Sequence, residues 1–103
     1  SKVQTANRIN ITDTTGKATT LDDTAFAANP QAFMLVADVK ANTVYRIDER
    51  SLGFEPGTAY SSSDTAGIVG QLNLDNGVIT PIATGFISTR GLIFVPPVKK
   101  DKG

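Results

Sequence analysis

Two stretches that lie far apart in the chain share one hairpin pattern. Residues 70–86 read GQLNLDNGVITPIATGF, and residues 8–21 read RINITDTTGKATTL. Equivalent positions are Ile9 and Leu72, Asn10 and Asn73, Ile11 and Leu74, Gly16 and Gly77, Thr19 and Thr80, and Leu21 and Ile82. Apolar and polar residues alternate on either side of a glycine-containing turn, which is typical of two antiparallel strands. The repeat predicts a chain of β-hairpins rather than helices.

Further strands are predicted between these two stretches and after them. TVYRID (residues 43–48) alternates, whereas FMLVADV (33–39) and GLIFVPP (91–97) are continuous apolar runs. Such runs predict strands that are buried on both faces, and the two prolines end the second one. The tight turns KAN (40–42) and DNG (75–77) separate alternating segments, and Gly77 is expected at positive φ.

Two segments have weaker patterns. DDTAFAAN (22–29) predicts one short helical turn that Asp22 or Asp23 caps. Residues 51–67 are rich in serine, glycine and threonine. They predict a long irregular connection, or one that holds a short edge strand around 58–61. Residues 1–97 are expected to form a single β-rich unit, and residues 98–103 a frayed tail.

The sequence therefore predicts an all-β fold with about six to eight short strands. Two architectures fit this prediction: a self-contained β-sandwich or small barrel, or blades of a β-propeller. The predicted core consists of Ile9, Ile11, Leu21, Leu35, Val44, Ile47, Leu72, Leu74, Ile79, Ile82, Ile93 and Val95.

Composition narrows the possible functions. The 103 residues contain ten basic and ten acidic side chains, so a broad nucleic-acid surface is not expected. The chain has no cysteine and no histidine, which removes thiolate metal sites and any Ser-His or Cys-His nucleophile pair within it. No apolar run approaches the roughly 20 residues of a membrane span, so no membrane partner is expected.

Two motifs resemble a known family. LVADVKANTVYRID (residues 35–48) resembles the YVADSxxNxIYRID hairpin of six-bladed propellers of the NHL, gluconolactonase and strictosidine-synthase-like group. LNLDNGVITPIATGFISTRGLIFVP (72–96) is similar to the junction between two blades in that group, where TxIATGF precedes xPxGLAFxP. The resemblance implies about two blades of antiparallel hairpins, which form an incomplete ring.

The resemblance also implies a function. The chain would be a C-terminal piece or subunit of a propeller protein, such as a lactonase-like hydrolase that needs residues from outside this chain. Another protein chain, or self-association, would complete the structure. The alternative is a non-catalytic β-rich interaction module that binds through its loops or an edge strand.

Two residues are candidates for ligand binding. Asp38 matches the family aspartate that contributes to a divalent-cation site, for which calcium is the expected ion; the alternative is that it caps the following turn. Arg90 stands where the family has asparagine or histidine, and a cation there would repel a metal. It would instead favour an anionic ligand or a salt bridge to a neighbouring carboxylate.

The other polar candidates have simpler interpretations. Asn10 begins an Asn-Ile-Thr glycosylation motif, which slightly favours a secreted protein. Asp48, Asp64 and Asp75 are expected to be solvated turn residues.

Overall fold

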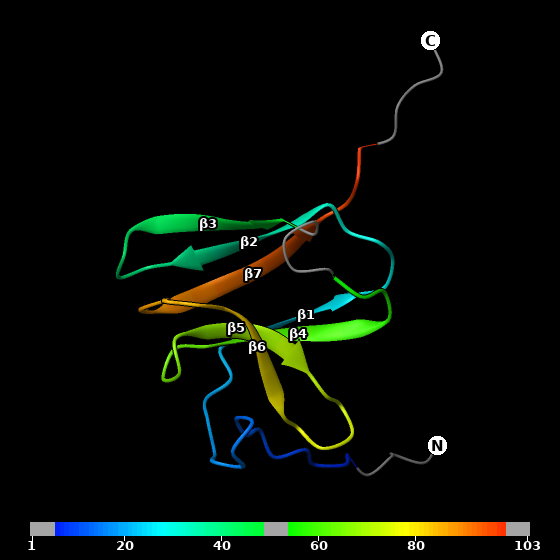
Figure 1. Ribbon diagram of the computed structural model, residues 1–103, viewed down its shortest axis with the longest axis vertical. Helices are drawn as coiled ribbons and strands as arrows, with labels where there is room; N and C mark the ends of the chain where they lie inside the picture. The colour runs from blue at the N-terminus through cyan, green and yellow to red at the C-terminus, as the bar shows by residue number, and fades with distance from the viewer. Residues whose placement is uncertain (1–5, 49–53, 99–103) are drawn as a thin grey trace.

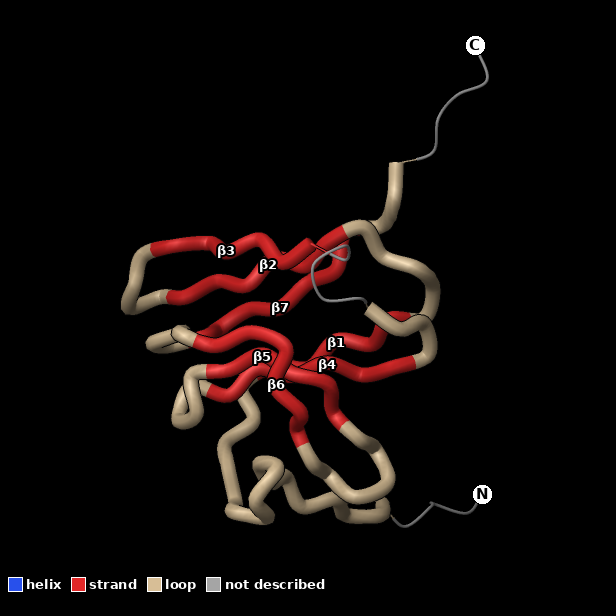
Figure 2. The backbone as a smooth tube through the Cα atoms, in the orientation of Figure 1, coloured by secondary structure: helices blue, strands red, loops and turns tan. Residues whose placement is uncertain are grey.

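Seven β-strands and no helix make up the residues that this computed structural model describes, 6–48 and 54–98. The strands are β1 (Asp23–Ala27), β2 (Phe33–Asp38), β3 (Thr43–Asp48), β4 (Thr58–Ser63), β5 (Ile68–Leu72), β6 (Ile79–Thr84) and β7 (Thr89–Val95). In Figure 2 the described residues are drawn as strands, loops and turns without a helix. The all-β prediction is confirmed. This part of the chain accordingly offers no long apolar helix that could span a membrane.

The strands form two antiparallel sheets. One is four-stranded, in the order β1-β4-β5-β6, and the other is three-stranded, in the order β3-β2-β7. In Figure 1 the three-stranded sheet lies above β1 and β4, and β7 is the strand of that sheet next to them. Neither sheet closes into a barrel. The arrangement therefore agrees with the self-contained, sandwich-like alternative among the predicted architectures.

The main core lies between the two sheets. Alternate residues of β2, Met34 and Val36, are fully buried and meet Tyr60 and Val69 of the other sheet in one cluster. The Tyr60 ring also contacts Phe94 edge to face, with 5.4 Å between the ring centroids. Burial of such side chains contributes about 1.5–3 kcal/mol each. This core fixes which face of each sheet points inward.

A second, smaller core lies on the opposite face of the four-stranded sheet. It contains Ala59, Ile68, Leu72 and Ile79, and Ile11 of the N-terminal segment packs against it. Thr12 anchors that segment on β6. Its N–H donates to the Gly77 carbonyl at 3.0 Å, and its carbonyl accepts from the Ile79 N–H at 2.9 Å. The N-terminal segment thus covers this sheet from outside.

The predicted helical turn at residues 22–29 is wrong, because this segment contains β1. Its residues pair with β4 from Asp23 opposite Ser62 to Ala27 opposite Thr58. Helix propensity over so few residues is a weak preference, and the ladder with β4 outweighs it.

A strand does form around residues 58–61, as one of the two alternatives predicted, but it is not an edge strand. β4 is longer and central, since β1 and β5 pair with its two edges. Five of its six residues, Ala59–Ser63, are buried. The buried Ser61 and Ser63 hydroxyls lie within hydrogen-bond distance of the Thr24 and Thr19 hydroxyls, whereas the buried Ser62 hydroxyl has no partner among the described residues. Small serine side chains fit between packed layers, so a serine-rich composition did not mark a loop here.

The first of the two similar hairpins forms only as a short turn without regular strands, in which the Asp13 N–H donates to the Lys17 carbonyl at 2.8 Å and the Thr19 N–H to the Ile11 carbonyl at 3.2 Å. Between residues 8 and 21, the only β-bridge within the segment joins Thr12 and Ala18, although Gly16 adopts a positive φ of 88°. The second hairpin forms as predicted, as β5 and β6, with Gly77 at a φ of 77°. The DNG turn lies between strands that bury apolar side chains, whereas the first stretch serves as cover.

The prediction that residues 33–39 and 91–97 are buried on both faces is wrong. In β2, buried and half-buried residues alternate, so only one face lies in the core. The predicted core was therefore too large. Ile47, Leu72 and Ile79 are buried; Ile11, Leu35, Ile82 and Val95 are half-buried; and Ile9, Leu21, Val44, Leu74 and Ile93 are exposed.

Candidate functional site

Asp38 holds two loops together. It lies at the end of β2, is 1% exposed, and accepts hydrogen bonds from the backbone N–H groups of Ile87 at 2.8 Å, Ser88 at 2.9 Å and Ala41 at 3.2 Å. The Ala41 bond caps the β2–β3 turn, as one interpretation of the sequence predicted. The Ile87 and Ser88 bonds fasten that turn to the β6–β7 loop. Both carboxylate oxygens are therefore used in the fold.

These bonds also stabilise the charged form of Asp38. The Ile87 N–H, followed by those of Ser88 and Ala41, holds the pKa of Asp38 below its ordinary value of 3.8, although burial opposes this. In the described part of the chain, no group of three or more acidic side chains lies close enough to hold a metal ion. The role of Asp38 as a metal or ligand site stays a prediction.

Arg90 forms salt bridges, as one of its two interpretations predicted. Its Nη1 lies 3.1 Å from Oδ2 of Asp64 and 3.9 Å from Oδ1 of Asp22. The Asp22 carboxylate also accepts from the Thr89 hydroxyl at 3.1 Å. Asp64 lies in the turn after β4, as predicted, but its side chain is only 28% exposed and pairs with Arg90, so the prediction that it is simply solvated is wrong. The Arg90 side chain holds the pKa of Asp64 below its ordinary value.

A cluster of four hydroxyls beside this ion pair was not predicted. The cluster comprises Thr19 and Thr20 from the N-terminal segment, and Ser63 and Thr65 from the end of β4 and the turn that follows. Hydroxyl oxygens within it lie 2.8–3.3 Å apart. The density of serine and threonine in both stretches was the available signal. The cluster attaches the covering segment to the four-stranded sheet.

Asn10 lies in the exposed N-terminal segment. Its backbone carbonyl packs directly against Gly77 of the β5–β6 turn, where a Cβ atom would collide with it. The structure thus places Asn10 at the surface, and its glycosylation stays a prediction.

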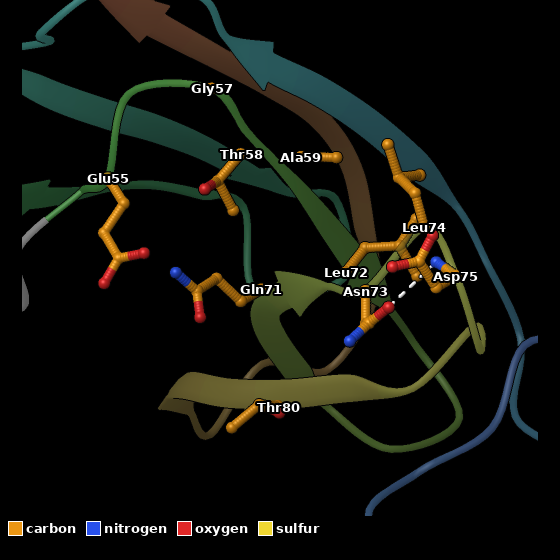
Figure 3. A pocket seen from close by; sticks show the side chains of 10 residues that line it. All are labelled: Glu55, Gly57, Thr58, Ala59, Gln71, Leu72, Asn73, Leu74, Asp75 and Thr80. Carbon is orange, nitrogen blue, oxygen red and sulfur yellow. Dashed lines mark hydrogen bonds between the residues drawn. The ribbon is translucent and has the colours of Figure 1, made fainter.

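A shallow polar groove of about 390 Å³ runs along the end of β5. Figure 3 shows Glu55 and Asp75 at opposite ends of it, with Gln71 and Asn73 between them. The Asn73 side chain accepts from the Asp75 N–H at 2.8 Å and is thereby part of the turn. The two carboxylates do not meet across the groove, so it offers no acid/base pair.

The clearest candidate for an interaction is the outer face of the three-stranded sheet. Strand register places on this face Phe33, Leu35, Ala37, Val44, Arg46, Asp48, Gly91, Ile93 and Val95. Val44 is 65% exposed and Ile93 57%, whereas Leu35, which lies on the central strand opposite Ile93, is half-buried. Arg46 lies over the Phe33 ring at 3.8 Å from its centroid and pairs with Asp48 at 2.9 Å. This outer face is apolar along β2 and β7, and the Arg46–Asp48 ion pair occupies two of its three positions on β3.

The edge strand β3 borders this outer face. Within residues 6–48 and 54–98, no segment pairs with the edge of β3 that points away from β2. The strand contains neither proline nor glycine, and its register with β2 is regular over all six residues. Natural edge strands are usually blocked by proline, bulges or coverage. Within the described residues the β3 edge has none of these three, although the strand is short and carries the charged side chains of Arg46 and Asp48.

Comparisons of the whole chain with protein-family models, curated proteins and solved structures find no match, so what this site does is argued from its own geometry.

Proposed function

We propose that this chain is a non-catalytic, β-rich interaction module that binds another polypeptide through the outer face of its three-stranded sheet. The observation that carries the proposal is the exposure of Val44 and Ile93 on one continuous apolar face. An exposed apolar patch on a folded domain commonly marks an interface.

The chemistry of the other sites supports this assignment. The Asp38 carboxylate and the Arg90 ion pairs serve to connect loops and strands. The chain has no histidine or cysteine to act as a base or nucleophile. A lactonase-like propeller hydrolase stays the other prediction, and it would require carboxylates from outside this chain.

The experiment compares two exposed apolar residues on different sheets. Ile93→Lys changes the outer face of the three-stranded sheet, whereas Phe26→Lys changes a residue of similar exposure, 55%, on β1 of the other sheet. Both variants are expected to fold, because both side chains are exposed. An environment-sensitive apolar dye reports the accessible apolar surface of each.

We expect the wild-type chain to bind the dye, Ile93→Lys to lose most of that binding, and Phe26→Lys to keep it. Circular dichroism and a denaturation midpoint establish that each protein is folded. A folded wild-type chain that binds no dye, or equal losses in the two variants, would contradict the proposal.

A further inference from the structure

The two sheets differ in how their outer faces and edges are sealed. An extended segment of the chain covers part of the four-stranded sheet near its β6 edge. Thr12 forms a single bridge with Val78, the residue before the edge strand β6, and Ile11 packs on the outside of the sheet. β6 also contains Pro81, which donates no backbone hydrogen bond. In the described residues the three-stranded sheet has neither device at β3.

The size of the outer face limits what can cover it. Three strands about 4.8 Å apart and six residues of about 3.3 Å each give a footprint of about 300 Å². A stable interface between two globular surfaces buries about 800 Å² on each partner. The outer face is therefore too small by itself for flat docking of a second domain, which leaves the unpaired edge of β3 as the place where a partner can add backbone hydrogen bonds.

We infer that the β3 edge takes an added antiparallel strand from a partner: an extended peptide that lies beside β3 and whose alternate side chains extend the outer face next to Val44, Arg46 and Asp48. This inference rests on the proposed function and specifies its partner. Main-chain hydrogen bonds to β3 would supply affinity, and the alternate side chains would supply specificity, as in other cases of strand addition.

The side chains of β3 define the chemistry of that peptide. Val44, Arg46 and Asp48 point to the outer face from alternate positions. In an antiparallel partner, the residues opposite them are read in reverse order: a basic residue opposite Asp48, an acidic residue opposite Arg46, and an apolar residue opposite Val44. Opposite charges directly across two strands attract, and like charges repel. The matching sequence is Lys-Thr-Glu-Thr-Val-Thr.

The test uses this synthetic peptide and a charge-exchanged control, Glu-Thr-Lys-Thr-Val-Thr, which has the same composition. Affinity is measured by NMR titration of the full chain, and amide hydrogen exchange locates the contact. We expect the matching peptide to slow the exchange of β3 amides, and to bind about ten-fold more tightly than the control, since two charged pairs change sign. The difference should shrink in high salt.

A reciprocal variant makes the test independent of folding effects. Arg46→Asp combined with Asp48→Arg keeps an ion pair within the strand, and keeps a guanidinium opposite Phe33 in the register. This double variant is expected to prefer the control peptide over the matching one. Retained preference for the matching peptide would overturn the inference.

The remaining outcomes separate the inference from the proposed function. Protection of β1 or β6 amides instead of β3, or no binding of either peptide, would overturn the strand-addition inference. The dye result with Ile93→Lys would still decide the proposed function by itself. Loss of dye binding by Ile93→Lys without peptide binding would leave an interaction face that takes a different partner.

Discussion

The two sheets of this protein have similar cores but different outsides. Both contribute residues to the cluster between them, and each has strands that alternate between buried and accessible positions. The outer face of the four-stranded sheet is covered in part by Ile11 and a hydroxyl cluster, with Phe26 still 55% exposed on β1, whereas the outer face of the three-stranded sheet exposes Val44 and Ile93 with no such cover among the described residues. The comparison teaches that coverage by a distant segment, and not the strand sequences themselves, determines whether an apolar face becomes a core or a surface.

The largest difference in the free energy of unfolding is expected between substitutions on the inner and outer faces of the three-stranded sheet. Met34 is fully buried on the inner face, and Val44 is 65% exposed on the outer face. Met34→Ala should lower the free energy of unfolding by about 2–5 kcal/mol, because it leaves a cavity. Val44→Ala should change it by less than about 0.5 kcal/mol. Chemical denaturation of both variants measures the difference, and similar losses would show that the outer face is also a core.

The second largest effect on stability is expected at the contact between the β5–β6 turn and the N-terminal segment that contains Asn10 and Ile11. Gly77 and Gly16 both have positive φ, but a Cβ on Gly77 would collide with the Asn10 carbonyl, whereas nothing lies within 4 Å of one on Gly16. Gly16→Ala should cost about 1 kcal/mol from backbone strain alone. Gly77→Ala should cost a further 1–3 kcal/mol or so, because the segment must shift. Equal denaturation midpoints for the two variants would show that the segment does not rest on this turn.

Truncation of Ile11, which packs on the second core, is expected to have a third, smaller effect on stability. Ile11→Ala should lower the free energy of unfolding by about 1–2 kcal/mol, since Ile11 is only partly buried. It should also increase the binding of the apolar dye, because the second core is then more accessible to solvent. The control is Leu74→Ala, which changes a residue that is 52% exposed and should leave dye binding unchanged. Unchanged dye binding in Ile11→Ala would argue that the two outer faces do not differ in coverage.

The smallest effect that we expect is on folding stability at low pH. The folded state holds the pKa values of Asp38, Asp64 and Asp13 below their ordinary value. A depressed carboxyl pKa stabilises the protein above the unfolded value, and this contribution is lost as the pH falls below about 4. Asp38→Asn should lower the denaturation midpoint at pH 7. It should also make the decrease in stability between neutral and acidic pH smaller than in the wild type. Asp75→Asn, at an exposed turn position, should do neither. An unflattened profile for Asp38→Asn would assign the acid sensitivity to other groups.

Some of the fold followed directly from local pattern. Alternation predicted β3, and the DNG turn predicted the β5–β6 hairpin with Gly77 at positive φ. The turn after β2 formed because Asn42 tolerates a φ of 51°. These features depend on the preferences of neighbouring residues, which a sequence states explicitly.

The candidate site was predicted only in part. Arg90 was expected either to bind an anion or to pair with a carboxylate, but its partners Asp64 and Asp22 lie 26 and 68 positions away in the chain. The outer face was missed because Val44 and Ile93 have the same apolar character as buried residues. Apolar residues therefore indicate which positions can be buried. Whether such a position is buried depends on whether another segment of the chain packs against it.

The sequence by itself determined an all-β chain, most of its strands, and the turns that require glycine or asparagine, because period and turn chemistry are local properties. Only the tertiary structure decided that residues 22–29 extend a sheet, that the serine-rich β4 lies at the centre, and that the first hairpin-like stretch serves as cover. Each of these outcomes depends on contacts between segments distant in the chain, whose combined free energy exceeds the local preferences of a few residues.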